Sequence, residues 1–243
     1  MKTIKLDAID STNTYLRQLS IQENLADFTV VIAALQTAGK GQMGTKWNAE
    51  KGKNLTFSVF KKISCLETHE GFYISMATSL AIYNALKYFN IPKLVIKWPN
   101  DILSENQKIC GILIENVIQS SKMTAAIIGI GLNVNQTNFE VGLNASSLKK
   151  ITGTHYDLDE VMLQITAQLQ KYAHLITERA FDILKEEYES LLFRKNKPST
   201  FKAPNGELFM GFIQGIAEDG KLQILLEDEI LKAFDLKEIK LMY

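Results

Sequence analysis

The residues from Gln36 to Lys53 combine glycine and lysine in a pattern that could bind an anion. The segment opens with QTAGKGQMGTKW, contains four lysines, and has glycine at Gly39, Gly41, Gly44 and Gly52. Glycine allows positive φ values and close approach of backbone N–H groups to a ligand, while lysine supplies positive charge. The segment is therefore a candidate phosphate clamp, with a flexible, solvated surface loop as the alternative.

Two common nucleotide-binding motifs do not account for this segment. GKGQMG matches the G-x-G-x-x-G spacing, but a dinucleotide site needs a helix to begin at the loop, because the helix N-terminus holds the pyrophosphate. The residues Thr45-Lys46-Trp47-Asn48 follow instead, with Gly52 soon after, so no helix is expected there. The G-x-x-x-x-G-K-[ST] phosphate loop does not occur in the sequence.

Four further segments place polar or charged residues beside apolar runs. They are DSTN at 10–13, KWPND at 97–101, KICGILIE at 108–115 and GIGLNVN at 129–135. Each has an ordinary structural explanation on its own: Ser-Thr-Asn is a helix N-cap, and a lysine is usually a solvated surface charge. The hypothesis of a functional site depends on the five segments occurring together and in this order.

The elements that would position these segments follow from the hydrophobic pattern. Alternating or β-branched runs predict strands at 2–6, 28–35, 55–60 and 94–98, and a central hairpin made by 108–118 and 124–134. Helical spacing of apolar residues predicts helices from Thr14, at 70–89, at 158–172 and at 179–193.

The end of the chain has a different character. The polar stretch at 194–199 interrupts both periodicities and contains a proline, so we predict a larger domain at 1–195 and a small one at 196–243. Short strands separated by turn signals predict that the small domain is a five-stranded, SH3-like β-barrel. A domain of this size is marginal alone, so we expect it to pack on the larger one.

Charge and cysteine content exclude several classes of protein. Lysine plus arginine equals aspartate plus glutamate at 27 each, which disfavours a nucleic-acid partner. Cys65 and Cys110 are too few for a disulfide framework and lack zinc-site spacing, so a reducing compartment and two buried, apolar cysteines are expected. The sequence has no signal peptide and no transmembrane segment, which predicts a cytoplasmic protein without a membrane partner.

Across essentially its whole length the chain resembles the biotin–protein ligase family. The family patterns are G-R-G-R-x-G-R-x-W, K-W-P-N-D, K-[IL]-x-G-[IL]-L-x-E and G-x-G-[IL]-N-x-N, and this sequence has a counterpart of each in order. The resemblance implies an α+β fold with a mixed central sheet flanked by helices, similar to class II synthetases. It also implies an enzyme that activates biotin with ATP and transfers it to a lysine of a biotin carboxyl carrier protein.

The resemblance assigns roles position by position. Neutral hydroxyl and amide groups at Ser11, Thr12, Asn13 and Gln36 would satisfy the ureido end of biotin without burying an unpaired charge. The nucleotide would meet the glycine loop, Trp47 and Asn100, with Asn100 on the adenine. The remaining expected ligand-binding residues are Gly39, Lys40, Gly41 and Gln42 of the loop, Gly111 and Gly131, which would leave room for ligand, and Asn133.

Lys108 would lie where the biotin carboxylate meets the α-phosphate. Two anions must approach each other there, and a fixed cation lowers the barrier by stabilising the developing charge. Lys40 and Asp101 complete the expected catalytic set. Asp101, with Glu115 as a second candidate, is expected to position a lysine or to hold Mg²⁺.

The chain departs from the family pattern at Lys40, Gln42 and Thr45, where arginine is usual. Lysine cannot form the bidentate hydrogen bonds by which arginine binds phosphate, and Gln42 and Thr45 carry no charge. We therefore expect the adenylate to bind more weakly unless Lys40, Lys46, Lys51 or Lys53 compensates. The first motif begins at Ser11, which leaves no room for the DNA-binding domain of longer relatives and predicts a ligase only.

Two alternatives to a biotin–protein ligase remain: a lipoate– or octanoate–protein ligase, and a non-catalytic biotin-binding module. The assembly is expected to be a monomer or a weak homodimer through a sheet edge.

Overall fold

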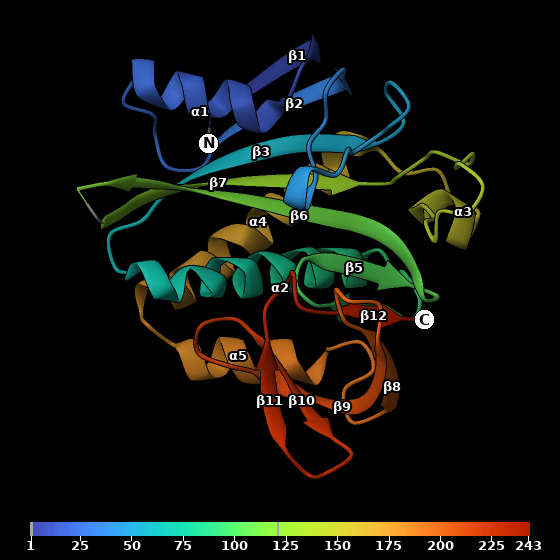
Figure 1. Cartoon of the computed structure of the whole chain (residues 1–243). Helices are drawn as coiled ribbons and strands as arrows, with labels where there is room; N and C mark the ends of the chain where they lie inside the picture. Colours follow the sequence, from blue (N-terminus) through green and yellow to red (C-terminus); the bar gives the residue numbers. More distant parts are fainter. Residues whose placement is uncertain (1, 121) are drawn as a thin grey trace.

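The computed structural model describes residues 2–120 and 122–243, which form a large mixed sheet with helices on both faces and a second, smaller sheet (Figure 1). The strands of the large sheet are β1 (Thr3–Ile9), β2 (Thr29–Gln36), β3 (Leu55–Lys62), β4 (Val95–Lys97), β5 (Asp101–Ser104), β6 (Gln107–Gln119) and β7 (Lys122–Leu132). The helices are α1 (Thr12–Gln22), α2 (Phe72–Tyr88), α3 (Leu148–Thr152), α4 (Leu158–Thr177) and α5 (Phe181–Ser190).

The strand order of the large sheet is β1-β2-β3-β7-β6-β5-β4, with β1 and β2 parallel and the other pairs antiparallel. The predicted central hairpin is confirmed, since β6 and β7 pair along their length in the middle of the sheet. Side chains alternate between the two faces, so Val30 and Val31 enter different cores. The expected α+β class is therefore confirmed.

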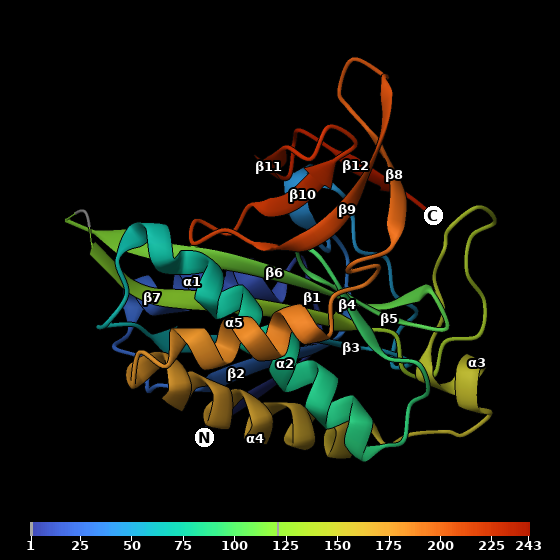
Figure 2. The ribbon, with the colours of Figure 1, turned by 90° about the horizontal axis from the view of Figure 1, so that it is seen from below.

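Helices cover the two faces unequally. α2, α4 and α5 lie across one face (Figure 2) and bury the main core, to which α2 contributes Ile74, Leu80 and Leu86. α1 alone covers the other face, where Leu16 packs against Val31 and neighbouring apolar residues in a smaller core. α1 begins at Thr12 rather than at Thr14, because the Ser11 side chain caps the helix by accepting from the Thr14 N–H.

The smaller sheet contains β8 (Pro198–Lys202), β9 (Leu208–Ile216), β10 (Leu222–Leu226), β11 (Leu231–Phe234) and β12 (Lys240–Met242), in the order β11-β10-β9-β8-β12. The five strands match the expected number. Among the described residues no ladder joins β11 to β12, so the closed barrel and the boundary at residue 196 stay predictions.

The smaller sheet packs on the rest of the molecule, as expected. The Trp98 indole donates to the Gly220 carbonyl at 2.9 Å, and the Ile216 N–H donates to the Glu189 carboxylate at 2.9 Å. Gly220 allows this close approach, because a Cβ there would lie 2.5 Å from the Phe72 ring.

Some local expectations were wrong. The short strand β5 and helix α3 were not predicted, and α5 ends at Ser190 because its C-cap Leu191 leaves helical geometry. Cys65 is only partly buried, whereas Cys110 is buried as expected. In the part of the chain that the structure describes, no helix has the length and apolar character that crossing a membrane requires.

Candidate active site

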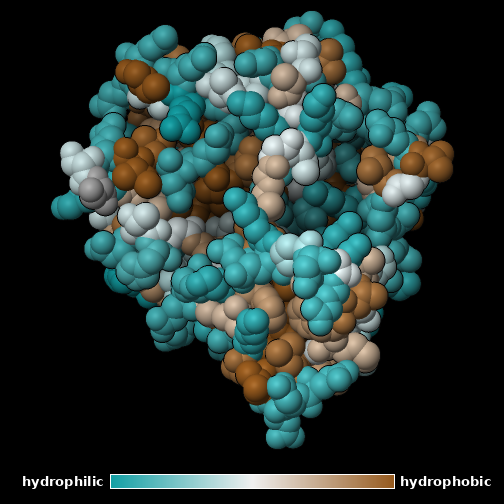
Figure 3. Space-filling view, viewed as in Figure 1, coloured by the Kyte–Doolittle hydropathy of each residue, from teal (hydrophilic) through white to brown (hydrophobic). Residues whose placement is uncertain are grey.

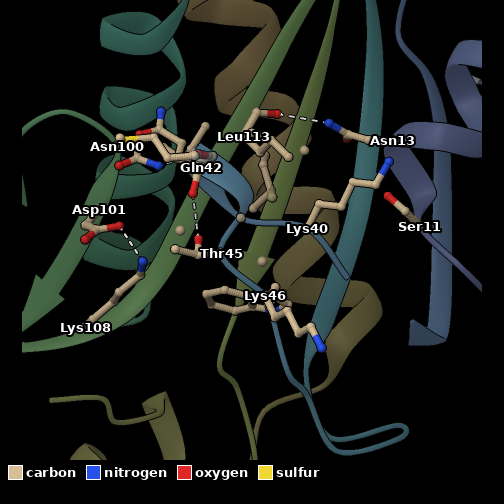
Figure 4. A pocket seen from close by; sticks show the side chains of 18 of the residues that line it. Ser11, Asn13, Lys40, Gln42, Thr45, Lys46, Asn100, Asp101, Lys108 and Leu113 are labelled. Carbon is tan, nitrogen blue, oxygen red and sulfur yellow. Dashed lines mark hydrogen bonds and ion pairs between the residues drawn. The ribbon is translucent and has the colours of Figure 1, made fainter. Parts of the chain in front are cut away.

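A cavity of about 430 Å³ collects residues from all five sequence segments. It opens near the centre of the face shown in Figure 3, where the surface is hollowed. Ser11 and Asn13 lie on one side of it and Asp101 and Lys108 on the opposite side (Figure 4). Five lysines and a single carboxylate line it: Lys40, Lys46, Lys97, Lys108, Lys240 and Asp101.

The first side is neutral and rich in hydrogen-bonding groups. Ser11, Thr12 and Asn13 are at most 3% exposed and lie at the start of α1, which faces the end of β2. The Gln36 side-chain oxygen accepts from the Thr12 N–H at 2.8 Å and from the Thr12 hydroxyl at 3.0 Å. The Ser-Thr-Asn segment therefore both caps α1 and lines the cavity, and the sequence had left both roles open.

The opposite side has a network of two lysines around one carboxylate. The Lys108 ammonium lies 2.6 Å from one Asp101 oxygen, and the Lys97 ammonium lies 3.4 Å from the other. A register shift between β5 and β6 sets Lys108 opposite Leu103 and Asp101 opposite Gly111. Because Gly111 has no side chain, the Lys108 side chain lies against it on its way to Asp101. The network leaves a net positive charge at this side.

The glycine loop is an ordered hairpin, which we call the glycine flap (residues 39–47). The Trp47 N–H donates to the Gly39 carbonyl at 2.9 Å, the Gly41 N–H donates to the Thr45 carbonyl at 2.7 Å, and Lys40 forms a bridge with Lys46. The tip is a 3₁₀ turn, Gln42–Gly44, whose Met43 has a φ of 56°. The Lys40 ammonium donates to the Thr14 hydroxyl at 2.9 Å, which ties the flap to α1.

Gly111 and Gly131 line the cavity, and in this structure the Trp47 ring lies beside both, so their contact with a ligand stays a prediction. A Cβ at Gly111 would lie 3.1 Å from the Trp47 ring, and one at Gly131 would collide with the indole. Both glycines therefore admit Trp47 against the sheet, with the Lys108 ammonium 5.7 Å from the centre of its ring. The buried indole nitrogen of Trp47 has no hydrogen-bond partner among the described residues.

Three predicted residues lie elsewhere. Gly39 closes the base of the flap behind the cavity, and the Asn133 side chain donates to the Ser146 carbonyl at 3.0 Å, outside the cavity lining. Glu115 does not approach the lysine network; it accepts from the Asn13 amide at 2.8 Å. By contrast, Asn100 does line the cavity and donates to the Ile112 carbonyl at 2.6 Å.

Most of the apolar wall comes from the sequence segments themselves. Ile112 and Leu113 belong to KICGILIE and Ile130 to GIGLNVN, and Gly129 makes room for Asn13. The motifs did not reveal Phe57 of β3, which adds to this wall, or Lys240, which reaches the cavity from the smaller sheet. Strand alternation could have identified Phe57, but nothing local in the sequence indicates Lys240.

Two titratable groups beside the lysine network are held in their neutral forms. Burial raises the pKa of the Cys110 thiol, so this cysteine is not a nucleophile at neutral pH. Burial, together with the nearby Asp101 charge, also raises the pKa of the Tyr243 phenol, while the Lys108 charge opposes the rise. The charged side chains on this side of the cavity are therefore the lysines and Asp101.

Asp101 does not fit the role of a metal ligand in this arrangement, because both of its oxygens face ammonium groups. No cluster of three or more His, Cys, Asp or Glu side chains that could hold a metal occurs in residues 2–120 and 122–243. The carboxylate instead forms ion pairs with two lysines, and its role in positioning them stays a prediction.

Comparisons with known proteins agree with this geometry. The chain is 28% identical over 234 residues to the bifunctional ligase/repressor BirA of Bacillus spizizenii, covering 94% of this chain and 70% of that protein. It is 28% identical over 216 residues to a biotin–[acetyl-CoA-carboxylase] ligase of Mycobacterium tuberculosis, covering 87% and 79% of the two chains.

A solved structure of biotin protein ligase from Aquifex aeolicus, in complex with biotin and ATP, superposes with a TM-score of 0.83 at 26% identity, covering 99% of this chain and 98% of that one. The family model described as "Biotin/lipoate A/B protein ligase family" matches residues 6–133, which include the polar end of the cavity, the glycine flap and the lysine network. The chain therefore belongs to the biotin/lipoate A/B protein ligase family.

Proposed function

We propose that this protein is a biotin–protein ligase that converts biotin and ATP to biotinyl-5′-AMP and diphosphate, then transfers the biotinyl group to a carrier lysine. The observation that carries the proposal is the single cavity that joins a neutral, hydrogen-bonding side to a lysine-rich side. Biotin has the same polarity, with a neutral ureido group at one end and a carboxylate at the other.

The neutral side is proposed to bind the ureido group through Ser11, Thr12, Asn13 and Gln36. A urea both donates and accepts hydrogen bonds, which these hydroxyl and amide groups can match inside a buried pocket. The charged groups nearest to this side are partnered, Lys40 with the Thr14 hydroxyl and Glu115 with the Asn13 amide, so neither is an unpaired charge that would oppose binding. Phe57, Leu113 and Ile130 would pack against the apolar part of biotin.

At the other side, Lys108 is proposed to lie between the biotin carboxylate and the α-phosphate. One carboxylate oxygen attacks the α-phosphorus, the bond to the β-phosphate oxygen breaks, and diphosphate leaves. Negative charge increases on the α-phosphate oxygens as the anions meet, and a fixed ammonium stabilises it most in the transition state. Asp101 would hold Lys108 in place, and Lys40 would add charge from the flap.

The nucleotide is proposed to lie between the glycine flap and the sheet. Trp47 offers an aromatic surface, and the amide of Asn100 already donates to Ile112, which leaves its oxygen for the adenine amino group. Mg²⁺ would enter with ATP, held by the phosphates, and no protein ligand for it is proposed. While the adenylate waits for its acceptor, the flap would shield the mixed anhydride from water.

In the second half-reaction, the neutral lysine amine of a biotin carboxyl carrier protein attacks the acyl carbon and AMP leaves. β1 lies at the edge of the large sheet, where a strand of the carrier could pair with it. The same edge could support a weak homodimer. No nucleic-acid partner is proposed, in keeping with the balanced charge.

The test is transfer of radiolabelled biotin to a purified apo-carrier domain with ATP and Mg²⁺, beside a parallel reaction with lipoate. Label on the carrier with biotin alone is the expected result. Label with lipoate alone would assign the protein to the lipoate branch of its family. Tight biotin binding without any transfer would identify a non-catalytic binding module.

A further inference from the structure

A chain of hydrogen bonds runs behind the wall of the neutral side, from Glu115 to Gln36. The Asn13 amide donates to the Glu115 carboxylate at 2.8 Å, and the Asn13 oxygen lies 2.6 Å from the Ser58 hydroxyl. The Ser58 hydroxyl lies 2.7 Å from the Thr12 hydroxyl, which lies 3.0 Å from the Gln36 oxygen. Ser58 and Glu115 are outside the cavity lining, whereas the other three residues line it.

Glu115 sets the orientation of the Asn13 amide. Glu115 and the Leu113 carbonyl, at 3.2 Å, offer only acceptors, so the Asn13 NH₂ group must face them. The Asn13 oxygen then points to Ser58, in space that Gly129 leaves free, since a Cβ there would lie 2.5 Å from that oxygen.

A count of hydrogens shows what this orientation does to the cavity. Asn13, Ser58, Thr12 and Gln36 place four oxygens in a row with three contacts between them, but only the two hydroxyls carry a hydrogen. Gln36 cannot turn its NH₂ group toward Thr12, because its oxygen accepts from the Thr12 N–H. One contact therefore lacks a hydrogen, and the row has acceptor capacity left over for a donor from the cavity.

We propose that Glu115 and Ser58 are positioning residues that make this wall an acceptor for the ureido N–H groups of the ligand. The inference rests on the proposed function. It assigns to the last residue of the KICGILIE segment a role at the opposite side of the cavity from Lys108, although both belong to β6. The carboxylate acts through Asn13 and does not touch the ligand.

Replacing Glu115 by glutamine tests whether the carboxylate sets the orientation of the Asn13 amide, because glutamine keeps the shape of the side chain but can also donate hydrogen bonds. The new amide can donate to the Asn13 oxygen when Asn13 turns over, at the loss of the Asn13 bond to the Leu113 carbonyl; Asn13 then donates to Ser58, Ser58 to Thr12 and Thr12 to Gln36. Each contact in the row then has its own hydrogen, and the row has less acceptor capacity for a donor from the cavity. We expect the KM for biotin in adenylation to rise about tenfold, with kcat at saturating biotin within about twofold of wild type. Ser58→Ala removes the hydroxyl that links Asn13 to Thr12, so both side chains lose a contact that holds them in place, and the KM for biotin should rise here too.

Two further measurements separate positioning from a general structural effect. Biotin methylated on a ureido nitrogen should be penalised less, relative to biotin, in Glu115→Gln than in wild type, since the lost donor no longer has its acceptor. Arg17→Gln is the matched control: Arg17 lies 3.9 Å from the other Glu115 oxygen and is half-exposed, so its loss leaves the row unchanged.

The outcomes distinguish the inference from the proposed function. If wild type does not adenylate biotin, the proposed function fails. If wild type is active, an unchanged KM in Glu115→Gln with an unchanged Tm overturns the inference. A fall in kcat together with Tm would also overturn it, because it would show that Glu115 serves the fold alone.

Discussion

Two neighbours, Asp101 and Gly111, hold the Lys108 side chain in position. Asp101 lies across the β5–β6 ladder and forms an ion pair with the Lys108 ammonium, and Gly111 lets the lysine side chain lie against the strand. A lysine on a solvated strand would sample many rotamers, whereas this one is only 34% exposed and is ion-paired. The cation is therefore placed before the substrates arrive, which is the condition for electrostatic catalysis.

Lys108→Ala is expected to slow biotinyl-adenylate formation about a hundredfold to a thousandfold, because the charge that develops between two anions loses its partner. Biotin binding without ATP should change little, since the ureido end holds the ligand. Single-turnover release of diphosphate and calorimetric titration with biotin measure the two quantities. An equal loss in both would show that Lys108 serves binding rather than catalysis.

At the scale of elements, the shape of the glycine flap determines which lysines lie near the cavity, where the family pattern has arginines. Lys40 and Lys46 lie on facing arms of the hairpin and line the cavity. Lys51 pairs with Asp7 and Lys53 with Glu50, outside the cavity lining. Of the four lysines expected to compensate, only Lys40 and Lys46 line the cavity, so we expect these two to contact phosphate.

Replacing Lys40 and Lys46 together by glutamine should speed adenylate dissociation about tenfold, since two charge-assisted contacts are lost. The matched control replaces Lys51 and Lys53 by glutamine and should leave the rate near that of wild type. Chasing bound labelled biotinyl-adenylate with unlabelled adenylate measures both. Equal rates in the two double variants would contradict the expectation that Lys40 and Lys46, and not Lys51 and Lys53, contact the adenylate.

A second element-scale contact joins the start of α2 to the α4–α5 junction. The Arg179 guanidinium donates to the Glu70 carboxylate at 2.5 Å and to the Cys65 carbonyl at 2.7 Å, and it holds the pKa of Glu70 below its usual range. A lowered folded-state pKa stabilises the fold above the pKa of the unfolded carboxyl group, and the contribution is lost as pH falls through the folded pKa.

Arg179→Ala should therefore lower the urea midpoint at pH 7, and the difference from wild type should shrink as pH falls below about 4.3, the ordinary pKa of a glutamate, and vanish once pH passes the lowered pKa of Glu70. Lys5→Ala, which removes an exposed pair with Asp159, is the control and should have a smaller effect. A difference that stayed constant from pH 7 to pH 3 would assign the effect to the bond with Cys65 instead.

The sequence predicted elements better than their contacts. The β6–β7 hairpin and the long helix α2 follow from periodicity because burial on a sheet face or helix stripe repeats regularly. The contact between Trp47 and Gly131 does not, because it joins a loop to a strand more than 80 residues away along the chain. For the same reason Glu115, which belongs to the same segment as Lys108, was expected beside the lysine network but contacts Asn13 on the other side of the cavity.

For the molecule as a whole, the smaller sheet is part of the cavity rim. β12 lies near the C-terminus (Figure 1) and carries Lys240 to the cavity, while the Lys97 ammonium lies 5.3 Å from the centre of the Tyr243 ring. The hydrogen bond from Trp98 to Gly220 fixes the two parts against each other. The segment KWPND thus contacts the smaller sheet on one side and the lysine network on the other.

Lys240→Gln tests whether the smaller sheet, which carries this lysine to the cavity rim, contributes to the proposed nucleotide site. Removing one exposed cation from the lysine-rich side should raise the KM for ATP about threefold to tenfold at low salt, with biotin binding unchanged. Exposed charges are screened, so the effect should shrink at high ionic strength. Lys237→Gln, at an exposed position outside the cavity lining, is the control. If both variants gave the same KM for ATP at every salt concentration, the smaller sheet would only support the fold; a loss specific to Lys240 would mean that neither part of the chain forms the complete site alone.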